Sequence, residues 1–442
     1  MSGMDFEALA RAMTNFIKGN PTAFHTVRSL ERIMDAENFE RLTEGEKWKL
    51  SAGKSYYVSR NGSSLIAFRI GCNVRKPGFQ IIASHTDSPT FKLKEKAVVP
   101  SGGQYSRLNV EPYGGMICYS WFDRPLSIAG RLLVRNDEGI TSKLVNIDRD
   151  LLLIPSVAIH MQRKVNEGLA INQQVDMLPL LGADLDNDAL MALIAREAGV
   201  PADRIVGSDL YLYCRSEASI WGAHDEYVSS ARLDDQQCVF ASFEGFLRGG
   251  CEETVAVFAA FDNEEVGSGT KQGAESTFLP DVLKRISSAM GLDEEEHMAS
   301  LASSFMISAD NAHAVHPNHP ELSDESNRVY MNEGVVVKSN AAQKYTSDGM
   351  SIAVLRQLAE RADVPLQYFS NRSDMAGGST LGNLAMAGAS MMCVDIGLPQ
   401  LAMHSSYETA GVRDTEYLIR LAGEFYSSHI GLSADGESLF IE

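Results

Sequence analysis

Polar side chains of metal-binding types follow the apolar, strand-like runs of this sequence at the points where the runs end. They are His85 and Asp87 after residues 79–84, Asp262, Glu264 and Glu265 after residues 255–261, and Asp310 after residues 305–309. Asp234 stands at the start of a predicted helix, and His404 follows the apolar run 389–396 after a turn. Neutral imidazole and carboxylate oxygen both suit zinc, cobalt and manganese. Together these residues predict a site for divalent metal ions.

The number and types of these residues suit a pair of ions. Two ions about 3.5 to 4 Å apart need one carboxylate between them and further ligands for each, as in hydrolytic aminopeptidases. The neighbours Glu264 and Glu265 point in different directions, so one can bind a metal while the other accepts a proton from the bridging water. Asp87 lies on the same side of an extended chain as His85, and we expect it to hold the other ring nitrogen of that histidine.

Strands that alternate with helices are expected to position these residues. The patterns predict helices at 5–18, 25–36, 233–247, 348–362 and 415–428, and strands at 62–70, 79–84, 255–261, 305–309, 335–338 and 389–396. This alternation favours an α/β fold with a mostly parallel, helix-covered sheet. In such sheets ligands gather at the carboxyl ends of the strands.

A different pattern interrupts this alternation. Residues 92–231 contain short strand-like runs, many turn residues and one helical segment at 187–198. At 442 residues the chain also exceeds the length at which one hydrophobic core keeps growing. We therefore expect two domains: a catalytic domain made of residues 1–91 and 232–442, and an inserted β-rich domain made of residues 92–231.

Five ordered motifs of the chain resemble those of the M18 aspartyl aminopeptidases. They are HTDSP at 85–89, RLDD at 232–235, FDNEEVGS at 261–268, SADNAHAVHP at 308–317 and QLAMHS at 400–405. The match runs from near the N-terminus to about residue 430. The resemblance implies a zinc-peptidase-like domain that removes N-terminal residues from peptides, preferably Asp or Glu. It also implies an inserted domain that forms dimers, which assemble into tetrahedral dodecamers.

Carried over by motif, the resemblance implies a role for each candidate residue. Asp234 would bridge two ions, with Glu265 and His404 completing one site and His85 and Asp310 the other, while Glu264 would be the general acid and base. The ions would be zinc, with cobalt or manganese as alternatives. His160 of the inserted domain would reach the active site of a neighbouring subunit, and Lys338 would face the substrate side chain. The segment 373–382 is similar to the Gly-rich loop near the substrate.

Two points of this assignment stay open. Asp235 follows Asp234 directly, so either carboxylate is a candidate for the bridge. His313, His316 and His319 form a cluster that suggests a third metal site. Their Pro-rich surroundings favour instead an irregular loop near the metal centre whose imidazoles orient neighbouring groups.

Net charge limits the partners of the chain. A formal charge of −19 argues against binding to nucleic acid and to anionic membranes, which both require clustered Lys and Arg. The same charge repels acidic peptides, so a preference for them needs a local cation in the site, and Lys338 is the candidate.

The cysteines and the apolar runs point to a cytoplasmic protein. The six cysteines are scattered and form no Cys-x-x-Cys pair. The first 20 residues lack the uninterrupted apolar core of a signal peptide, and no stretch has the length of a membrane span.

Other activities have weaker support. A dinuclear aminopeptidase of neutral or broad specificity, or a related amidase or deacylase, would need the same metal ligands. A non-catalytic relative would be expected to lose Glu264, which is present. The chain has no Gly-x-Ser-x-Gly or His-Glu-x-x-His motif, so serine hydrolase and zincin chemistry are not indicated.

Overall fold

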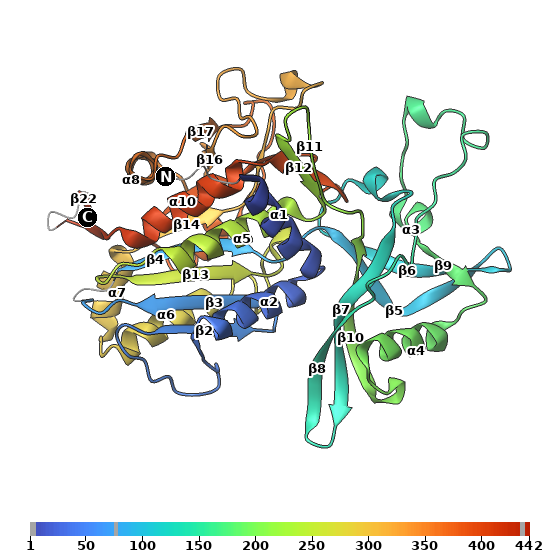
Figure 1. Cartoon of the computed structure of the whole chain (residues 1–442), viewed down its shortest axis with the longest axis horizontal. Coiled ribbons are helices and arrows are strands. Elements are labelled where there is room, and N and C mark those ends of the chain that lie inside the picture. The colour runs from blue at the N-terminus through green and yellow to red at the C-terminus, as the bar shows by residue number, and fades with distance from the viewer. Residues whose placement is uncertain (1–5, 75–77, 434–437) are drawn as a thin grey trace.

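The computed structural model of the chain describes residues 6–74, 78–433 and 438–442 and has two lobes (Figure 1). In the described ranges, one lobe is built around a nine-stranded sheet and the other around a six-stranded sheet. A third, five-stranded sheet lies beside the nine-stranded one. No helix in these ranges combines the length and the apolar character needed to cross a bilayer.

The nine-stranded sheet is mostly parallel, as predicted. Its order is β1 (Glu40–Arg41), β2 (Ser55–Arg60), β3 (Ser64–Ile70), β13 (Val255–Phe261), β4 (Phe79–His85), β14 (Phe305–Ala309), β18 (Met392–Gly397), β16 (Val335–Lys338) and β17 (Leu366–Phe369). The central strands β13, β4, β14 and β18 are parallel to one another. Antiparallel pairing begins at β3 on one side and at β16 on the other.

Helices cover both faces of this sheet. One face packs on α1 (Phe6–Gly19), α2 (Ala23–Ala36), α5 (Leu233–Arg248), α8 (Gly349–Ala362) and α10 (Asp414–Ser427). The other packs on α6 (Phe278–Ala289) and α9 (Leu381–Ala385), with α7 (Glu294–Ala302) beside them. Along β4, Ile82 faces the first core while Ile81 and Ala83 face the second. Because both faces are buried, these strands are continuous apolar runs, which is why the sequence predicted them.

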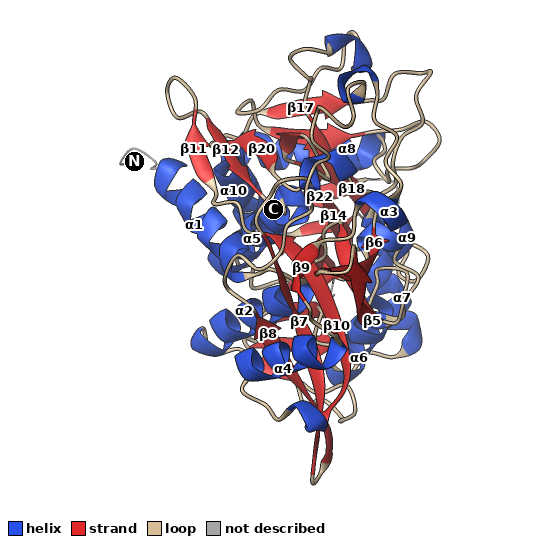
Figure 2. Ribbon diagram, turned by 90° about the vertical axis from the view of Figure 1, so that its right-hand side faces the viewer, coloured by secondary structure: helices blue, strands red, loops and turns tan. Residues whose placement is uncertain are grey.

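The six-stranded sheet is antiparallel throughout and forms the core of the second lobe. Its order is β8 (Gly139–Asn146), β7 (Leu126–Asn136), β10 (Ile205–Cys214), β5 (Thr90–Ser101), β6 (Tyr105–Tyr113) and β9 (Leu180–Ala183). Helix α4 (Asn187–Ala198) has the predicted bounds, because the side chain of Asp186 caps its first turn and Gly199 ends it in the left-handed conformation. Figure 2 shows α4 packed against this lobe.

The five-stranded sheet affects the proposed domain boundary. It contains β11 (Ser219–Trp221), β12 (Tyr227–Ser230), β20 (Glu408–Gly411), β19 (Pro399–Leu401) and β15 (Ala312–His313). Strand β12 pairs with β20, so residues 219–230 join the lobe of the nine-stranded sheet. We therefore propose that the inserted lobe spans about residues 90–214. Near the C-terminus, β21 (Ile430–Leu432) and β22 (Leu439–Ile441) form a separate hairpin.

The predicted elements agree closely with the structure. The helix predicted from residue 5 begins at Phe6 among the described residues, since residue 5 lies outside them. The strand predicted at 389–396 begins later, at Met392, because residues 386–390 form the turn after α9. The other predicted strands and helices end within about two residues of their observed bounds.

Candidate metal centre

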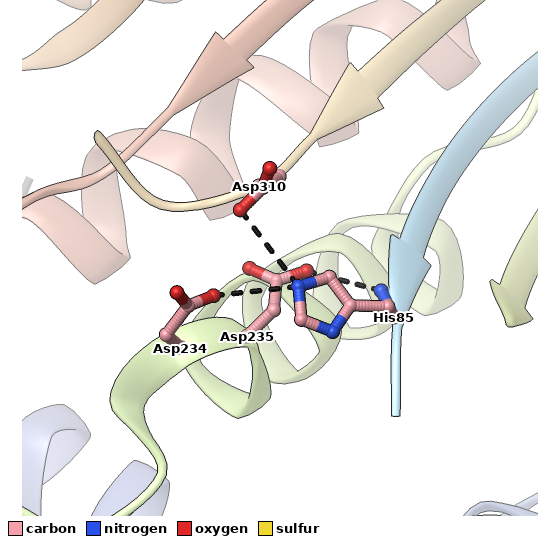
Figure 3. Close-up of side chains that lie close together, drawn as sticks. All are labelled: His85, Asp234, Asp235 and Asp310. Carbon is pink, nitrogen blue, oxygen red and sulfur yellow. Dashed lines mark hydrogen bonds and ion pairs between the residues drawn. The ribbon is translucent and has the colours of Figure 1, made fainter. Parts of the chain in front are cut away.

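Parallel strands bring the predicted ligands to one edge of the nine-stranded sheet. Phe261 pairs with His85 across β13 and β4, so the turn that follows Phe261 begins beside His85. Ser308 pairs with Ala83 across β14 and β4, so Asp310 also reaches this edge. Figure 3 shows Asp310 and Asp234 approaching the ring of His85 from different elements.

Asp234 lies between the two histidines. Its Oδ1 is 3.3 Å from Nε2 of His85, and its Oδ2 is 3.3 Å from Nε2 of His404. Oδ1 of Asp310 lies 3.8 Å from Nε2 of His85, and Oε2 of Glu265 lies 3.4 Å from Nε2 of His404. Tetrahedral ligands about 2.0 to 2.1 Å from one zinc ion stand roughly 3.3 Å apart. The spacing therefore suits two ions that share Asp234.

The burial and hydrogen bonding of the cluster also suit cations. His85 and Asp234 are almost fully buried. Oε1 of Glu265 is buried as well, and no residue that the structure describes donates a hydrogen bond to it. A buried carboxylate oxygen without a donor is costly unless a cation contacts it. Burial, with the charge of Asp234, raises the pKa of Glu265 well above its usual range. The contribution of Asp234 to this shift reflects a negative potential, which also attracts divalent ions.

Asp235 takes a different place from Asp234. Its Oδ2 accepts a hydrogen bond from the backbone N–H of His85 at 3.1 Å, as Figure 3 shows. Asp235 belongs to a group with His85 and Asp310 that could hold one ion. Asp234 is the residue that presents one oxygen to each histidine.

The turn that carries Glu264 and Glu265 is held by Asp87. The carboxylate of Asp87 accepts hydrogen bonds from the backbone N–H groups of Glu264 and Glu265, each at 3.2 Å. The turn, η4 (Glu264–Val266), follows Asn263, which has a left-handed backbone. Nδ1 of His85 lies 3.1 Å from the carbonyl oxygen of Asp87 and 3.5 Å from its carboxylate. The ring nitrogen therefore donates to the backbone carbonyl, which leaves Nε2 free for a metal.

His404 is oriented by two groups outside the predicted set. Its Nδ1 donates to the carbonyl oxygen of Gly115 at 2.6 Å, which directs Nε2 toward Asp234. Its backbone N–H donates to Oε1 of Glu408 at 2.7 Å, and the backbone N–H of Asp234 donates to Oε2 of Glu408 at 3.0 Å. Burial, with the charge of Asp234, raises the pKa of Glu408 to about 8.

Sequence reasoning missed Glu408 and Gly115. Glu408 is an isolated acidic residue in a short strand, and its only signal is its place four residues after His404. Gly115 acts through its backbone carbonyl. Every residue has such a carbonyl, so the residue type gives no signal for this role.

Glu264 differs from the neighbouring carboxylates in the interactions of its side chain. Its side chain makes no hydrogen bond to any residue in the described part of the chain, and it lies close to His85 and Glu265. Burial, with the charges of Asp310 and Asp87, raises the pKa of Glu264 to about 8. A carboxyl group with a pKa near neutrality suits both acceptance and donation of a proton.

Lys338 reaches the metal centre by a different route from the one predicted. The apolar run 334–337 favours a strand that ends with Lys338 at the ligand edge, but this expectation is wrong, because β16 runs antiparallel to β18. Its side chain nevertheless extends to Asp310, with Nζ 3.4 Å from Oδ2, and lies over the ring of Tyr345. Burial lowers the pKa of Lys338, but the charge of Asp310 outweighs it, so the net shift is upward. The ammonium is charged, and it makes no hydrogen bond to the residues that the structure describes.

His160 lies away from the metal centre of its own chain. It is exposed in the segment between β8 and α3 (Gln173–Asp176), which projects from the second lobe (Figure 1). The structure therefore does not bring His160 together with the other predicted residues.

The three histidines of the 313–319 segment do not share one site. His313 lies on β15, and its ring packs edge-to-face on that of Phe369, with centroids 6.0 Å apart. The rings of His316 and His319 lie 5.2 Å apart in an exposed loop. Among the described residues, no group of three potential metal ligands includes any of these histidines.

Comparison with known proteins identifies similar chains. The family model described as aminopeptidase I zinc metalloprotease (M18) matches residues 16–426. The chain is 44% identical over 425 residues to a probable M18 family aminopeptidase 2 of Clostridium novyi, covering 95% of this chain and 98% of that one. It is 38% identical to aspartyl aminopeptidase 1 of Schizosaccharomyces pombe, covering 95% and 94%. The S. cerevisiae mApe1 dodecamer shows a similar fold, with a TM-score of 0.83, 28% identity and coverage of 96% and 97%.

Proposed function

The chain belongs to the M18 family of zinc metalloproteases and is an aminopeptidase, and we propose that it uses two zinc ions to remove acidic N-terminal residues from peptides. The observation that carries the two-ion proposal is the position of Asp234, which has one oxygen 3.3 Å from each of His85 and His404. One ion would be held by Asp234, His85 and Asp310, and the other by Asp234, Glu265 and His404.

The side chains around this pair have separate tasks in peptide hydrolysis. When bound, the ions supply an acidified water and a Lewis acid for the scissile carbonyl group. Glu264 accepts the proton of the attacking water and delivers it to the nitrogen of the leaving amine. The raised pKa of Glu264, about 8, supports this double role. Asp87 positions Glu264 through the backbone N–H group.

Lys338 supports a preference for acidic N-terminal residues. Its buried ammonium lies beside Asp310, at the ligand edge of the sheet. The name of the S. pombe relative, aspartyl aminopeptidase 1, supports the same substrate class. An aminopeptidase of neutral or broad specificity is the alternative, because the metal ligands do not choose the side chain that is cleaved.

We infer that the chain forms a homo-oligomer, and a dodecamer is the model that the S. cerevisiae mApe1 structure offers. The projecting segment around His160 and the adjoining helix α3 support this inference, because they expose large apolar side chains: Val157 is 53% exposed, Met161 82% and, on α3, Val175 62%. These residues line a hollow of about 670 Å³ in the second lobe. Exposed apolar surface of this kind marks protein contacts. We propose that His160 of one subunit completes the site of the next.

The six cysteines are all free thiols, which supports a reducing, cytoplasmic location.

The proposed function is tested by removing the metal with a chelator and restoring zinc, cobalt or manganese before assay of Asp, Glu, Leu and Lys amides. We expect two equivalents of zinc per chain and the highest kcat/KM for the Asp or Glu amide.

Glu264→Gln should keep both ions and lose several orders of magnitude in kcat, since water activation and amine protonation both need this group. Loss of zinc from this variant would make Glu264 a ligand and reverse its role with Glu265.

A further inference from the structure

Part of the inserted lobe lies directly against the metal centre. Tyr113 is the last residue of β6. Its hydroxyl donates a hydrogen bond to Oδ2 of Asp87 at 2.6 Å and accepts one from Nδ2 of Asn263 at 2.7 Å. Both partners belong to the lobe of the nine-stranded sheet, and both adjoin the predicted ligands. One phenol therefore joins the two lobes beside the site.

The partners of Asn263 determine the direction of these hydrogen bonds. Oδ1 of Asn263 accepts from the hydroxyl of Thr270 at 2.8 Å and from Nε2 of Gln272 at 2.7 Å. The amide nitrogen of Asn263 is thus the group that faces Tyr113. Because an amide nitrogen only donates, the phenol oxygen accepts from it and gives its own proton to Asp87.

Asp87 connects Tyr113 to the turn that carries Glu264 and Glu265. Besides the hydrogen bond from the phenol, its carboxylate accepts hydrogen bonds from the backbone N–H groups of Glu264 and Glu265. Three donors hold the carboxylate in one orientation, and the carboxylate holds the proton carrier and one metal ligand. We propose that Tyr113 is a positioning residue of the metal centre, through which the inserted lobe fixes Asp87, Glu264 and Glu265. This inference rests on the proposed function and adds a residue to it.

The chain that follows Tyr113 supports the same connection on the other side of the site. Two residues later, the carbonyl oxygen of Gly115 accepts the hydrogen bond from Nδ1 of His404. The backbone N–H of Ile117 donates to the carbonyl oxygen of His404 at 3.0 Å. The stretch 113–117 thus contacts both the Asp87 side and the His404 side of the centre, so its position affects both predicted ion sites.

Tyr113→Phe tests the proposal, with Tyr211→Phe as the matched control. The ring of Tyr211 packs edge-to-face on that of Tyr113, with centroids 5.6 Å apart, but its hydroxyl makes no hydrogen bond to a described residue. In Tyr113→Phe we expect zinc affinity, measured by chelator competition, to fall about tenfold at the weaker site. At saturating zinc we expect kcat to fall about tenfold or more while KM changes less than about threefold. Tyr211→Phe should match the parent in all three quantities.

Equal zinc affinity and equal kcat in the two variants would overturn the role of Tyr113. Sedimentation of both variants checks that the comparison is made in the same assembly state. Chelator competition needs no substrate, so it tests the role of Tyr113 separately from the proposed aminopeptidase function. A parent protein that binds zinc but cleaves no aminoacyl amide would refute the proposed function, while the zinc affinities of the variants would still decide whether Tyr113 positions the site.

Discussion

Each histidine of the metal centre has one ring nitrogen engaged by a backbone carbonyl. Nδ1 of His85 donates to Asp87, and Nδ1 of His404 donates to Gly115. A ring that donates from Nδ1 offers the lone pair of Nε2, so backbone geometry selects the tautomer that binds a metal. Asp234 then meets both Nε2 atoms with separate oxygens. At the scale of single residues, orientation matters as much as residue type.

Substitution of Asp234 should remove ligands from both proposed ion sites, whereas His85 serves one. We expect Asp234→Ala to lose most of both zinc equivalents and His85→Ala to lose chiefly one, as measured by elemental analysis after dialysis. Asp235→Asn is the control, because the amide oxygen can still accept the hydrogen bond from His85 N–H. If Asp234→Ala kept two zinc ions and Asp235→Asn lost them, Asp235 and not Asp234 would be the carboxylate that bridges the ions.

Lys338 should decide the preference for acidic residues. A charge-assisted hydrogen bond from its ammonium to a substrate carboxylate would contribute about 1.5 to 3 kcal/mol, or roughly a ten- to hundred-fold preference for Asp over Leu amides in kcat/KM. We expect Lys338→Met to abolish this preference, so that the Asp-to-Leu ratio of kcat/KM falls to about one. The ratio is informative even if the variant binds zinc less tightly through the loss of its pair with Asp310.

Lys344→Met is the control for this substitution, since Lys344 is exposed in the same part of the chain. An Asp-to-Leu ratio that stays unchanged in Lys338→Met would show that selectivity lies elsewhere and would favour the broad-specificity alternative.

At the scale of elements, the sequence predicts best what depends on neighbouring residues. Buried strands such as β13 and β4 are apolar runs that end in polar residues, so their bounds and the ligands after them follow from local pattern. Strand direction and partner choice depend on distant residues. The direction of β16, and with it the position of Lys338, could not be predicted because β18 lies more than 50 residues further along the chain. The pairing of β12 with β20, which shifts the lobe boundary, has the same cause.

Arg131 of β7 is a further residue that links the two lobes. Arg131 donates to the carbonyl oxygen of Asn61 at 2.6 Å and to its side chain at 3.2 Å, and its Nε donates to Asp209 at 2.8 Å. Its guanidinium also lies 4.4 Å from the ring centroid of Phe24. Lysine cannot reproduce this planar, forked geometry.

We expect Arg131→Lys to destabilise the protein by about 1 to 3 kcal/mol, since charged hydrogen bonds and a cation–π contact are lost. Thermal unfolding should show a lower midpoint than the parent. Arg135→Lys is the control, because Arg135 is exposed on the same strand and its side chain makes no hydrogen bond or ion pair with the described residues. Equal midpoints for the two variants would mean that the Arg131 contacts add no stability.

At the scale of the whole molecule, the site is incomplete within one chain if His160 acts across an interface. The segment around His160 projects from the inserted lobe, and this lobe also contacts the metal centre through residues 113–117. Assembly and catalysis would thus be connected by the same lobe.

Mixed oligomers test this connection directly. Glu264→Gln and His160→Ala subunits should each have low activity, because the first lacks the proton carrier and the second lacks the group given to its neighbour. When the two are co-expressed and assemble at random, about one quarter of the sites should combine Glu264 of one subunit with His160 of the next, given closed symmetric assembly. We therefore expect activity in the mixture that neither variant shows when purified separately, with zinc content unchanged because neither substitution removes a proposed ligand. A mixture no more active than the mean of its components, in an assembly shown by sedimentation to be oligomeric, would mean that His160 does not act between subunits, and a monomeric parent would remove the interface itself.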